Sequence, residues 1–191
     1  VHSIEHGWFI DEECVDMMIK QGVWWVPTLA LVPRSVKRRQ EDASWGEQQL
    51  ANEDEKDMQI LNKMKEHVPL WKDAVKRGLN IAFGTDQSHR LMTGENLVEF
   101  EYMVDWLGMS PMEAIISAGQ KASECIERPE LGVLKAGCKA DLLIVDGDPL
   151  SDIKILQDRD RLRMIIKNGV PVIDRMRQPP PGTPIELRRT R

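Results

Sequence analysis

Two short β-prone segments, far apart in the sequence, each end in a side chain that can bind a metal ion or carry a proton. The first is Ile4-Glu5-His6-Gly7 at the start of the chain, and the second is Ile81-Ala82-Phe83-Gly84-Thr85-Asp86 near its middle. A loop is expected after each of them. Barrels of parallel β/α units present their functional groups in this way, at the carboxyl ends of the strands. The two segments therefore predict an α/β chain corresponding to the later part of such a barrel.

The length and composition of the chain restrict its architecture and its partners. With 191 residues it is short for a complete (β/α)8 TIM barrel, which typically needs about 250. Its formal net charge of −5 argues against a nucleic-acid partner, which normally requires a basic face. The sequence shows no apolar run near the ~18 residues of a membrane span and no signal-peptide pattern. We therefore expect no membrane partner and a cytoplasmic protein.

The cysteines point to the same compartment. Cys14, Cys125 and Cys138 are odd in number, widely spaced and without a CxxC pair. This usage is typical of reduced thiols in a reducing environment. We expect all three to be structural.

The first part of the chain alternates strand and helix patterns. A helix is expected over about 11–21, between Asp11 as N-cap and Gly22, and a buried strand over 23–26. Residues 29–46 are expected to form an irregular, partly basic loop. A charged helix over roughly 47–66 is expected to be broken by Pro69, before a helical piece over 70–77 and a strand over 79–84. Strands and helices joined by short links predict parallel pairing.

The pattern changes in the second part of the chain. Helices are expected over 95–107 and from Ser110 to about 126, the latter opened by Ser110, Pro111 and Glu113 as a capping sequence. Residues 142–145 predict a buried strand, and residues 164–173 predict a hairpin with an Asn-Gly turn. We expect a partial barrel over 1–128, a β-sandwich portion over 129–175 and a flexible tail over 176–191.

Taken one at a time, the candidate site residues have ordinary explanations. A lone histidine such as His6 is more often structural than a ligand, although imidazole is a common metal ligand. Asp86 also fits a loop carboxylate or a helix cap, and a carboxylate there must be hydrogen-bonded, exposed or metal-bound. His2 lies deeper on the first strand than a partner of His6 would. His67 lies on a charged helix and is expected to be solvated.

The loop after Asp86 offers two further candidates. His89 stands in a position from which a barrel loop reaches substrate, and it fits an ordinary loop histidine equally well. Arg90 could pair with a substrate carboxylate. We expect both residues to be substrate-binding.

Longer stretches of sequence are more specific than these single residues. They comprise Ser3–Gly7, Val26–Leu29, Gly84–Asp86, Gly94–Leu97 with Glu99, Met109–Ile115 and Leu131–Leu150. By these segments the chain, from residue 2 to about 173, resembles the metal-dependent amidohydrolase superfamily, in particular its imidazolonepropionase-like and Xaa-Pro dipeptidase-like branch. The resemblance is to the C-terminal portion of such enzymes.

The resemblance implies a fold and a chemistry. His6 would end the sixth barrel strand, residues 23–26 would form the seventh, and Asp86 would end the eighth. In this family the eighth-strand aspartate binds a divalent metal and takes the proton of the attacking water, so Asp86 is expected to be catalytic. His6 and Asp86 are expected to bind the metal, with zinc the expected ion. In members with a single ion, the sixth-strand histidine more often hydrogen-bonds the water or the substrate. The substrate would be a small molecule or a peptide with an amide, peptide or cyclic-amide C–N bond.

The departures from the family define the alternatives. The paired histidines of strand one, the lysine of strand four and the histidine of strand five have no counterpart in this sequence. His6 and Asp86 alone would bind zinc weakly, because zinc normally takes three or four protein ligands. We therefore expect a chain that forms a homo-oligomer or depends on a missing N-terminal half. The alternative is a non-catalytic short homologue that folds through oligomerisation or a partner chain.

Overall fold

The structure of the protein, a computed structural model, describes residues 1–41, 47–87 and 91–176. It includes their side chains except those of residues 41 and 47–54. The expected tail lies outside this part of the chain except for Met176.

A three-stranded parallel sheet lies at the centre of the first part of the chain. Its strands are β1 (Ser3–Glu5), β2 (Trp24–Val26) and β3 (Asn80–Ile81), in the order β1-β2-β3. Parallel pairing places Ile4 opposite Trp25, and Trp25 opposite Ile81. The carboxyl ends of the strands therefore meet at one edge, as the sequence pattern predicted.

Helix α1 (Glu12–Gln21) connects β1 to β2 in the expected place. The Asp11 side chain caps its start by accepting the Cys14 backbone N–H, and Gly22 ends it in the left-handed conformation at φ 67°. Val15 and Met18 bury its apolar face.

Two expectations for residues 29–77 are wrong. The expected loop contains helix α2 (Leu31–Glu41), and helix α3 (Glu47–Lys76) runs through Pro69 without a break. Pro33 lies in the first turn of α2, where the helix needs no N–H from it. Pro69 lies on the solvent side of α3, where water can bond the carbonyl that loses its helical partner.

One of the basic residues that suggested a loop, Arg39, instead forms an ion pair between the two helices. Arg39 of α2 and Asp57 of α3 are buried, with side-chain exposures of 6% and 3% and an Nη2–Oδ2 distance of 2.5 Å. Arg39 also donates a hydrogen bond to Ser35. Pairing within one polar cluster removes the cost of burying either charge alone, so a basic stretch could become a packed helix.

The strand expected over 79–84 is shorter in the structure. Only Asn80–Ile81 forms β3, and the N–H of Phe83 turns to the carbonyl of Ser117 at 3.1 Å. Ser117 begins the π-helical turn η2 (Ser117–Lys121), which joins α5 (Pro111–Ile116) to α6 (Ala122–Cys125). Such a turn widens the helix at one point, and here its first carbonyl supports the chain just before Asp86.

The other expected helices are present. The one predicted over 95–107 consists of η1 (Asn96–Val98) and α4 (Glu99–Leu107). At the start of α5, Ser110 and Glu113 form the predicted capping box.

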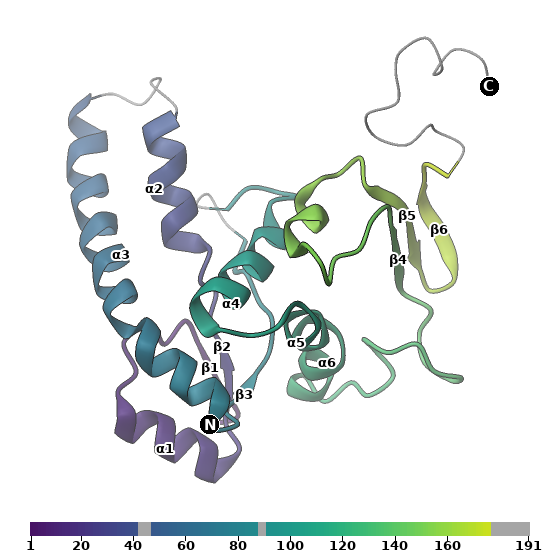
Figure 1. Ribbon diagram of the computed structural model, residues 1–191, viewed down its shortest axis with the longest axis horizontal. Helices are drawn as coiled ribbons and strands as arrows, with labels where there is room; N and C mark the ends of the chain where they lie inside the picture. Colours follow the sequence, from purple (N-terminus) through teal and green to yellow (C-terminus); the bar gives the residue numbers. More distant parts are fainter. Residues whose placement is uncertain (42–46, 88–90, 177–191) are drawn as a thin grey trace.

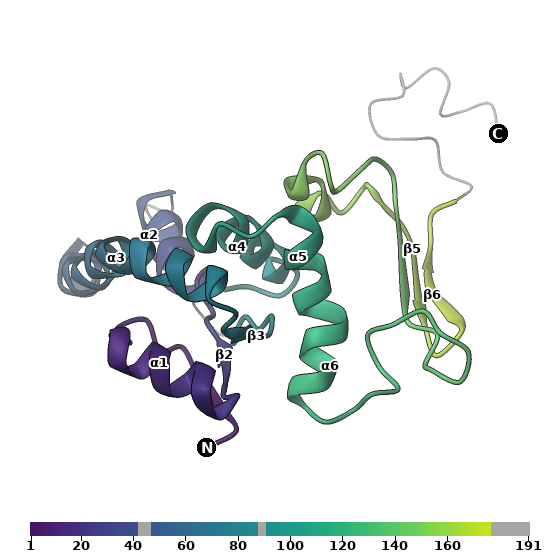
Figure 2. The ribbon, with the colours of Figure 1, turned by 60° about the horizontal axis from the view of Figure 1, so that its bottom comes forward.

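A second sheet is antiparallel and contains β4 (Leu142–Val145), β5 (Leu162–Lys167) and β6 (Val170–Asp174). The short helix η3 (Ile153–Gln157) precedes β5. Asn168 and Gly169 form the predicted hairpin turn, at φ 50° and 78°. Figures 1 and 2 show that helices α4, α5 and α6 separate this sheet from the parallel one.

The link to the antiparallel sheet passes very close to η2. A Cβ atom on Gly119 would lie 2.6 Å from the carbonyl oxygen of Gly132, and Gly132 itself has φ 70°. Both positions therefore require glycine.

Two fully buried tryptophans form the centre of the core. Trp25 of β2 and Trp71 of α3 have 0% exposure and ring centroids 5.7 Å apart. The indole N–H of Trp25 donates to the carbonyl oxygen of His6, whereas that of Trp71 has no partner in the described part of the chain. The two indole rings are thus equally buried, but within the described residues only the Trp25 N–H forms a hydrogen bond.

We expect Trp25→Phe to destabilise the protein by about 1–3 kcal/mol more than Trp71→Phe. Both variants lose similar apolar contact, but only Trp25→Phe leaves a carbonyl oxygen without its donor. Urea unfolding of both variants at one pH measures the difference. Equal losses of unfolding free energy would contradict the assigned bond.

Candidate functional site

His6 follows β1 and is fixed at several atoms. Its N–H donates to the Val26 carbonyl at 2.9 Å, and its own carbonyl accepts the Trp25 indole N–H at 2.7 Å. The Trp8 ring packs against the imidazole in an edge-to-face arrangement, with centroids 5.5 Å apart. These contacts hold the backbone of His6 at φ 61°, which is unusual for a residue other than glycine. The imidazole nevertheless remains accessible, at 43% exposure.

Thr28 holds the inner nitrogen of this ring. Its Oγ1 lies 2.7 Å from His6 Nδ1, and the residue is 2% exposed. Thr28 also has a positive φ, 48°, in the loop after β2. Sequence reasoning did not assign Thr28 to the site. The signal was a hydroxyl residue two positions after the strand, within Val26–Leu29.

Asp86 approaches from the loop after β3. Its Oδ2 lies 3.8 Å from His6 Nε2, and its side chain is 59% exposed. It too has a positive φ, 45°. The three strand-end loops thus bring His6, Thr28 and Asp86 together at one edge, each in a backbone conformation that costs energy unless its surroundings hold it.

The pair of outer atoms suits a shared cation. Two ligands of a tetrahedral zinc ion, each bound at 2.0–2.1 Å, lie roughly 3.3 Å apart. The observed 3.8 Å between Nε2 and Oδ2 comes within a small side-chain adjustment of that value. Among the described residues, however, no group of three or more His, Cys, Asp or Glu side chains could hold a metal ion. The described residues therefore bring two potential ligands, His6 and Asp86, to this edge and form no complete metal site.

The other two described histidines, His2 and His67, lie apart from this edge. His2 bonds the Cys125 carbonyl through Nε2 at 2.7 Å and so ties β1 to α6. His67 was expected to be solvated, but it is half-buried, with its ring 5.6 Å from that of Phe9. His89 and Arg90 lie outside the described residues, and their expected substrate contacts stay predictions.

Cys14, Cys125 and Cys138 are all free in the structure, as expected of reduced thiols, and their structural role stays a prediction.

A buried carboxylate lies behind the site. Glu99 of α4 has 0% exposure, and its two oxygens accept the backbone N–H groups of Leu29 and Ala30 at 2.7 and 2.8 Å. Burial raises the pKa of Glu99 to about 8, although both hydrogen bonds act in the opposite direction. Glu99 therefore anchors the loop that carries Thr28.

An ion-pair cluster around Glu95 connects helix α2 to the segment before α4. Glu95 pairs with Arg34 at 2.7 Å and Arg38 at 2.5 Å, and it accepts the Met92 N–H. The Met92 N–H and the two arginines hold the pKa of Glu95 below its usual value despite partial burial. The cluster ties the segment before η1 to helix α2.

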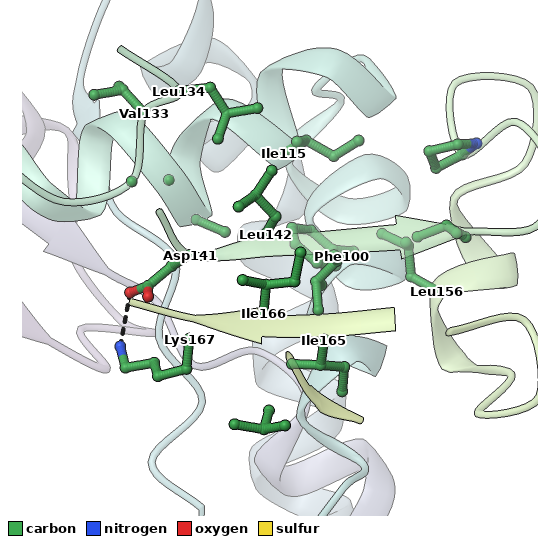
Figure 3. Close-up of a pocket in the computed structure, with 17 residues that line it drawn as sticks. Phe100, Ile115, Val133, Leu134, Asp141, Leu142, Leu156, Ile165, Ile166 and Lys167 are labelled. Atoms are coloured by element: carbon green, nitrogen blue, oxygen red, sulfur yellow. Dashed lines mark hydrogen bonds and ion pairs between the residues drawn. The ribbon is translucent and has the colours of Figure 1, made fainter. Parts of the chain in front are cut away.

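A cavity of about 760 Å³ lies elsewhere, between the helices and the antiparallel sheet. Figure 3 shows Phe100 and Ile115 on the helical side facing Leu142, Ile165 and Ile166 of the sheet. The ion pair of Asp141 and Lys167, at 2.7 Å, stands at its edge. None of the side chains of the His6–Asp86 edge lines this apolar cavity.

Comparison with protein families matches residues 1–172 to the Amidohydrolase family. The chain belongs to this family, and the resemblance expected from its sequence is confirmed.

Particular relatives give the match more detail. The ochratoxinase of Aspergillus niger is 31% identical over 169 residues, covering 87% of this chain and 33% of that protein. Among solved structures, a Xaa-Pro dipeptidase with bound methionine has a TM-score of 0.72 at 31% identity, covering 90% of this chain and 39% of the other. A prolidase complexed with N-methylphosphonate-L-proline has a TM-score of 0.72 at 28% identity, with coverages of 91% and 40%. The chain thus spans about a third to two-fifths of these relatives.

In the described part of the chain, every helix is too short or too polar to cross a membrane.

Proposed function

We propose that this chain is the C-terminal part of a metal-dependent hydrolase of the amidohydrolase type. It would cleave an amide, peptide or cyclic-amide C–N bond. The observation that carries the proposal is the convergence of His6 Nε2 and Asp86 Oδ2 at one edge of a parallel sheet, 3.8 Å apart. Membership of the amidohydrolase family supports it.

The proposed roles follow from the chemistry of the two side chains. His6 Nε2 and Asp86 Oδ2 would hold a divalent metal, with zinc the expected ion. When bound, the metal lowers the pKa of a water molecule and polarises the scissile carbonyl. The Asp86 carboxylate would accept a proton from the attacking water as the new C–O bond forms. It would return that proton to the nitrogen as the C–N bond breaks.

The remaining metal ligands would come from polypeptide outside this sequence. Strands β1, β2 and β3 would then be the sixth, seventh and eighth strands of a complete barrel. This arrangement accounts for two exposed ligands at the end of a short parallel sheet. The relatives named above suggest Xaa-Pro dipeptides as the first substrates to test.

The antiparallel sheet carries an exposed apolar surface that another polypeptide could cover. Four apolar residues on it and its linker are strongly exposed: Leu134 at 75%, Leu143 at 49%, Val170 at 61% and Val172 at 59%. Together with the apolar cavity, they favour cover by further polypeptide, either the upstream part of the enzyme or another copy. The same surface motivates the alternative function, a non-catalytic homologue that folds on a partner.

We expect the isolated chain to bind Zn²⁺ weakly, and His6→Ala or Asp86→Ala to abolish this binding. Isothermal titration with Zn²⁺ measures it. His2→Gln is the matched control, because His2 stands directly before β1, at the other end of the strand from His6, and bonds the Cys125 carbonyl. Tight stoichiometric metal and hydrolysis of Xaa-Pro dipeptides are expected only when the upstream polypeptide is supplied.

Two results would contradict the proposal. One is unchanged Zn²⁺ binding in both single variants, which would place the metal elsewhere. The other is a metal-free assembled protein without hydrolytic activity, which would favour the non-catalytic alternative.

A further inference from the structure

A continuous set of contacts leads from a buried carboxylate to the outer face of the site. Glu99 binds the N–H groups of Leu29 and Ala30, and the preceding residue, Thr28, contacts His6 Nδ1. His6 Nε2 in turn faces Asp86. Apart from Asp86 and the accessible His6 ring, these groups are buried. The inner nitrogen of His6 therefore meets a fixed protein group instead of water.

The position of one proton decides what the outer nitrogen can do. A neutral imidazole carries its proton on either Nδ1 or Nε2, and the nitrogen without it has the free lone pair. At 3.8 Å, Asp86 Oδ2 is too distant to accept a hydrogen bond from Nε2. Thr28 Oγ1, at 2.7 Å from Nδ1, can either accept a hydrogen bond from Nδ1–H or donate one to an unprotonated Nδ1. Only the first arrangement leaves the lone pair on Nε2, which the proposed metal-binding role of His6 requires.

We propose that Thr28 is a positioning residue whose hydroxyl accepts the Nδ1 proton of His6 and so presents the Nε2 lone pair toward Asp86. The inference rests on the proposed metal-binding role of His6. A protein group on the inner nitrogen fixes both the tautomer and the orientation of a ligating ring. Without it, the imidazole could turn about its χ2 angle or move its proton to Nε2.

Glu99 explains why Thr28 can hold this position. A threonine at φ 48° is strained, because its branched Cβ crowds the backbone. The two hydrogen bonds from Leu29 and Ala30 to Glu99 fix the chain directly after Thr28. The hydroxyl therefore stays directed at the imidazole.

The tautomer of His6 can be measured on the metal-free chain. Long-range ¹H–¹⁵N correlation spectra at about pH 8.5 distinguish Nδ1–H from Nε2–H, and His6→Gln assigns the signals. We expect the Nδ1–H form to predominate in the wild type and in Thr28→Ser, which keeps the hydroxyl. Thr28→Val is expected to shift His6 toward a mixture of tautomers. Ser123→Ala, which removes a buried hydroxyl bonded to Gln120, should leave His6 unchanged.

A His6 tautomer that is the same in Thr28→Val as in the wild type would overturn the inference, as would a predominant Nε2–H form in the wild type. In the assembled enzyme, Thr28→Val should also weaken metal affinity by about 10–100-fold, measured by chelator competition, with recovery in Thr28→Ser. The two proposals fail separately. An assembled protein without metal refutes the hydrolase proposal but leaves the tautomer result intact.

Discussion

Asp86→Asn is expected to lower kcat of the assembled hydrolase by about 10³-fold or more. Asparagine keeps the shape of the side chain but cannot take a proton from water, and general-base catalysis alone contributes roughly 10²–10⁴-fold. The variant also gives up a charged ligand 3.8 Å from His6 Nε2, so the metal content should fall too. Steady-state hydrolysis of an Xaa-Pro dipeptide and elemental analysis measure the two effects.

A nearby carboxylate provides the matched control for this variant. Glu5 ends β1, is exposed and bonds the hydroxyl of Ser3. Glu5→Gln removes the same charge from the same edge and should leave kcat within about two-fold of wild type, as expected for an exposed residue outside the chemistry. If Asp86→Asn behaved like Glu5→Gln, the catalytic assignment of Asp86 would be wrong.

The stability of the wild-type protein is expected to fall as the pH rises from about 4.5 to about 8 because of Glu99. In the folded protein burial raises its pKa from 4.5 to about 8, so the folded state holds a proton that the unfolded chain has lost. Stability decreases with pH wherever the folded state binds more protons, and it levels off above about 8. The difference between the two pKa values corresponds to roughly 5 kcal/mol.

Glu99→Gln isolates this effect. Glutamine cannot ionise, so the fall in stability between pH 5 and 8 should be much shallower in the variant. At low pH the variant is expected to be less stable than wild type by about 1–3 kcal/mol, because the amide nitrogen cannot accept the second backbone N–H. The difference should shrink as the pH rises and wild type loses stability. Urea unfolding of both proteins at several pH values gives the comparison. Parallel pH profiles would show that Glu99 does not titrate in this range.

The sequence predicted those parts of the fold that local chemistry determines. Capping groups such as Asp11 and Ser110 and the Asn168-Gly169 turn act over a few residues, so their elements appear where expected. Helix α2 and the continuity of α3 were missed because they depend on distant partners. The buried Arg39–Asp57 pair stabilises a basic segment that looks like a loop when read alone.

The candidate site shows the same division. His6 and Asp86 could be named because each follows a recognisable strand, and the structure brings the two side chains together. Their roles in binding and catalysis stay predictions. Thr28 and Glu99 belonged to the family-matching segments but were given no role, since their contacts join segments that only the folded chain brings together. A polar residue in the loop after a strand, as Thr28 is two positions after β2, is worth examining as a support for the side chain that follows the neighbouring strand.

The close approach of Gly119 and Gly132 restricts which substitutions these two positions can tolerate. With no room for even a methyl group at either position, the backbone of η2 and the linker to the antiparallel sheet lie in direct contact. A larger residue would push the linker outward and widen the gap lined by Phe100 and Leu142. A substitution at either glycine should therefore displace the antiparallel sheet as a whole, while the His6–Asp86 edge stays in place.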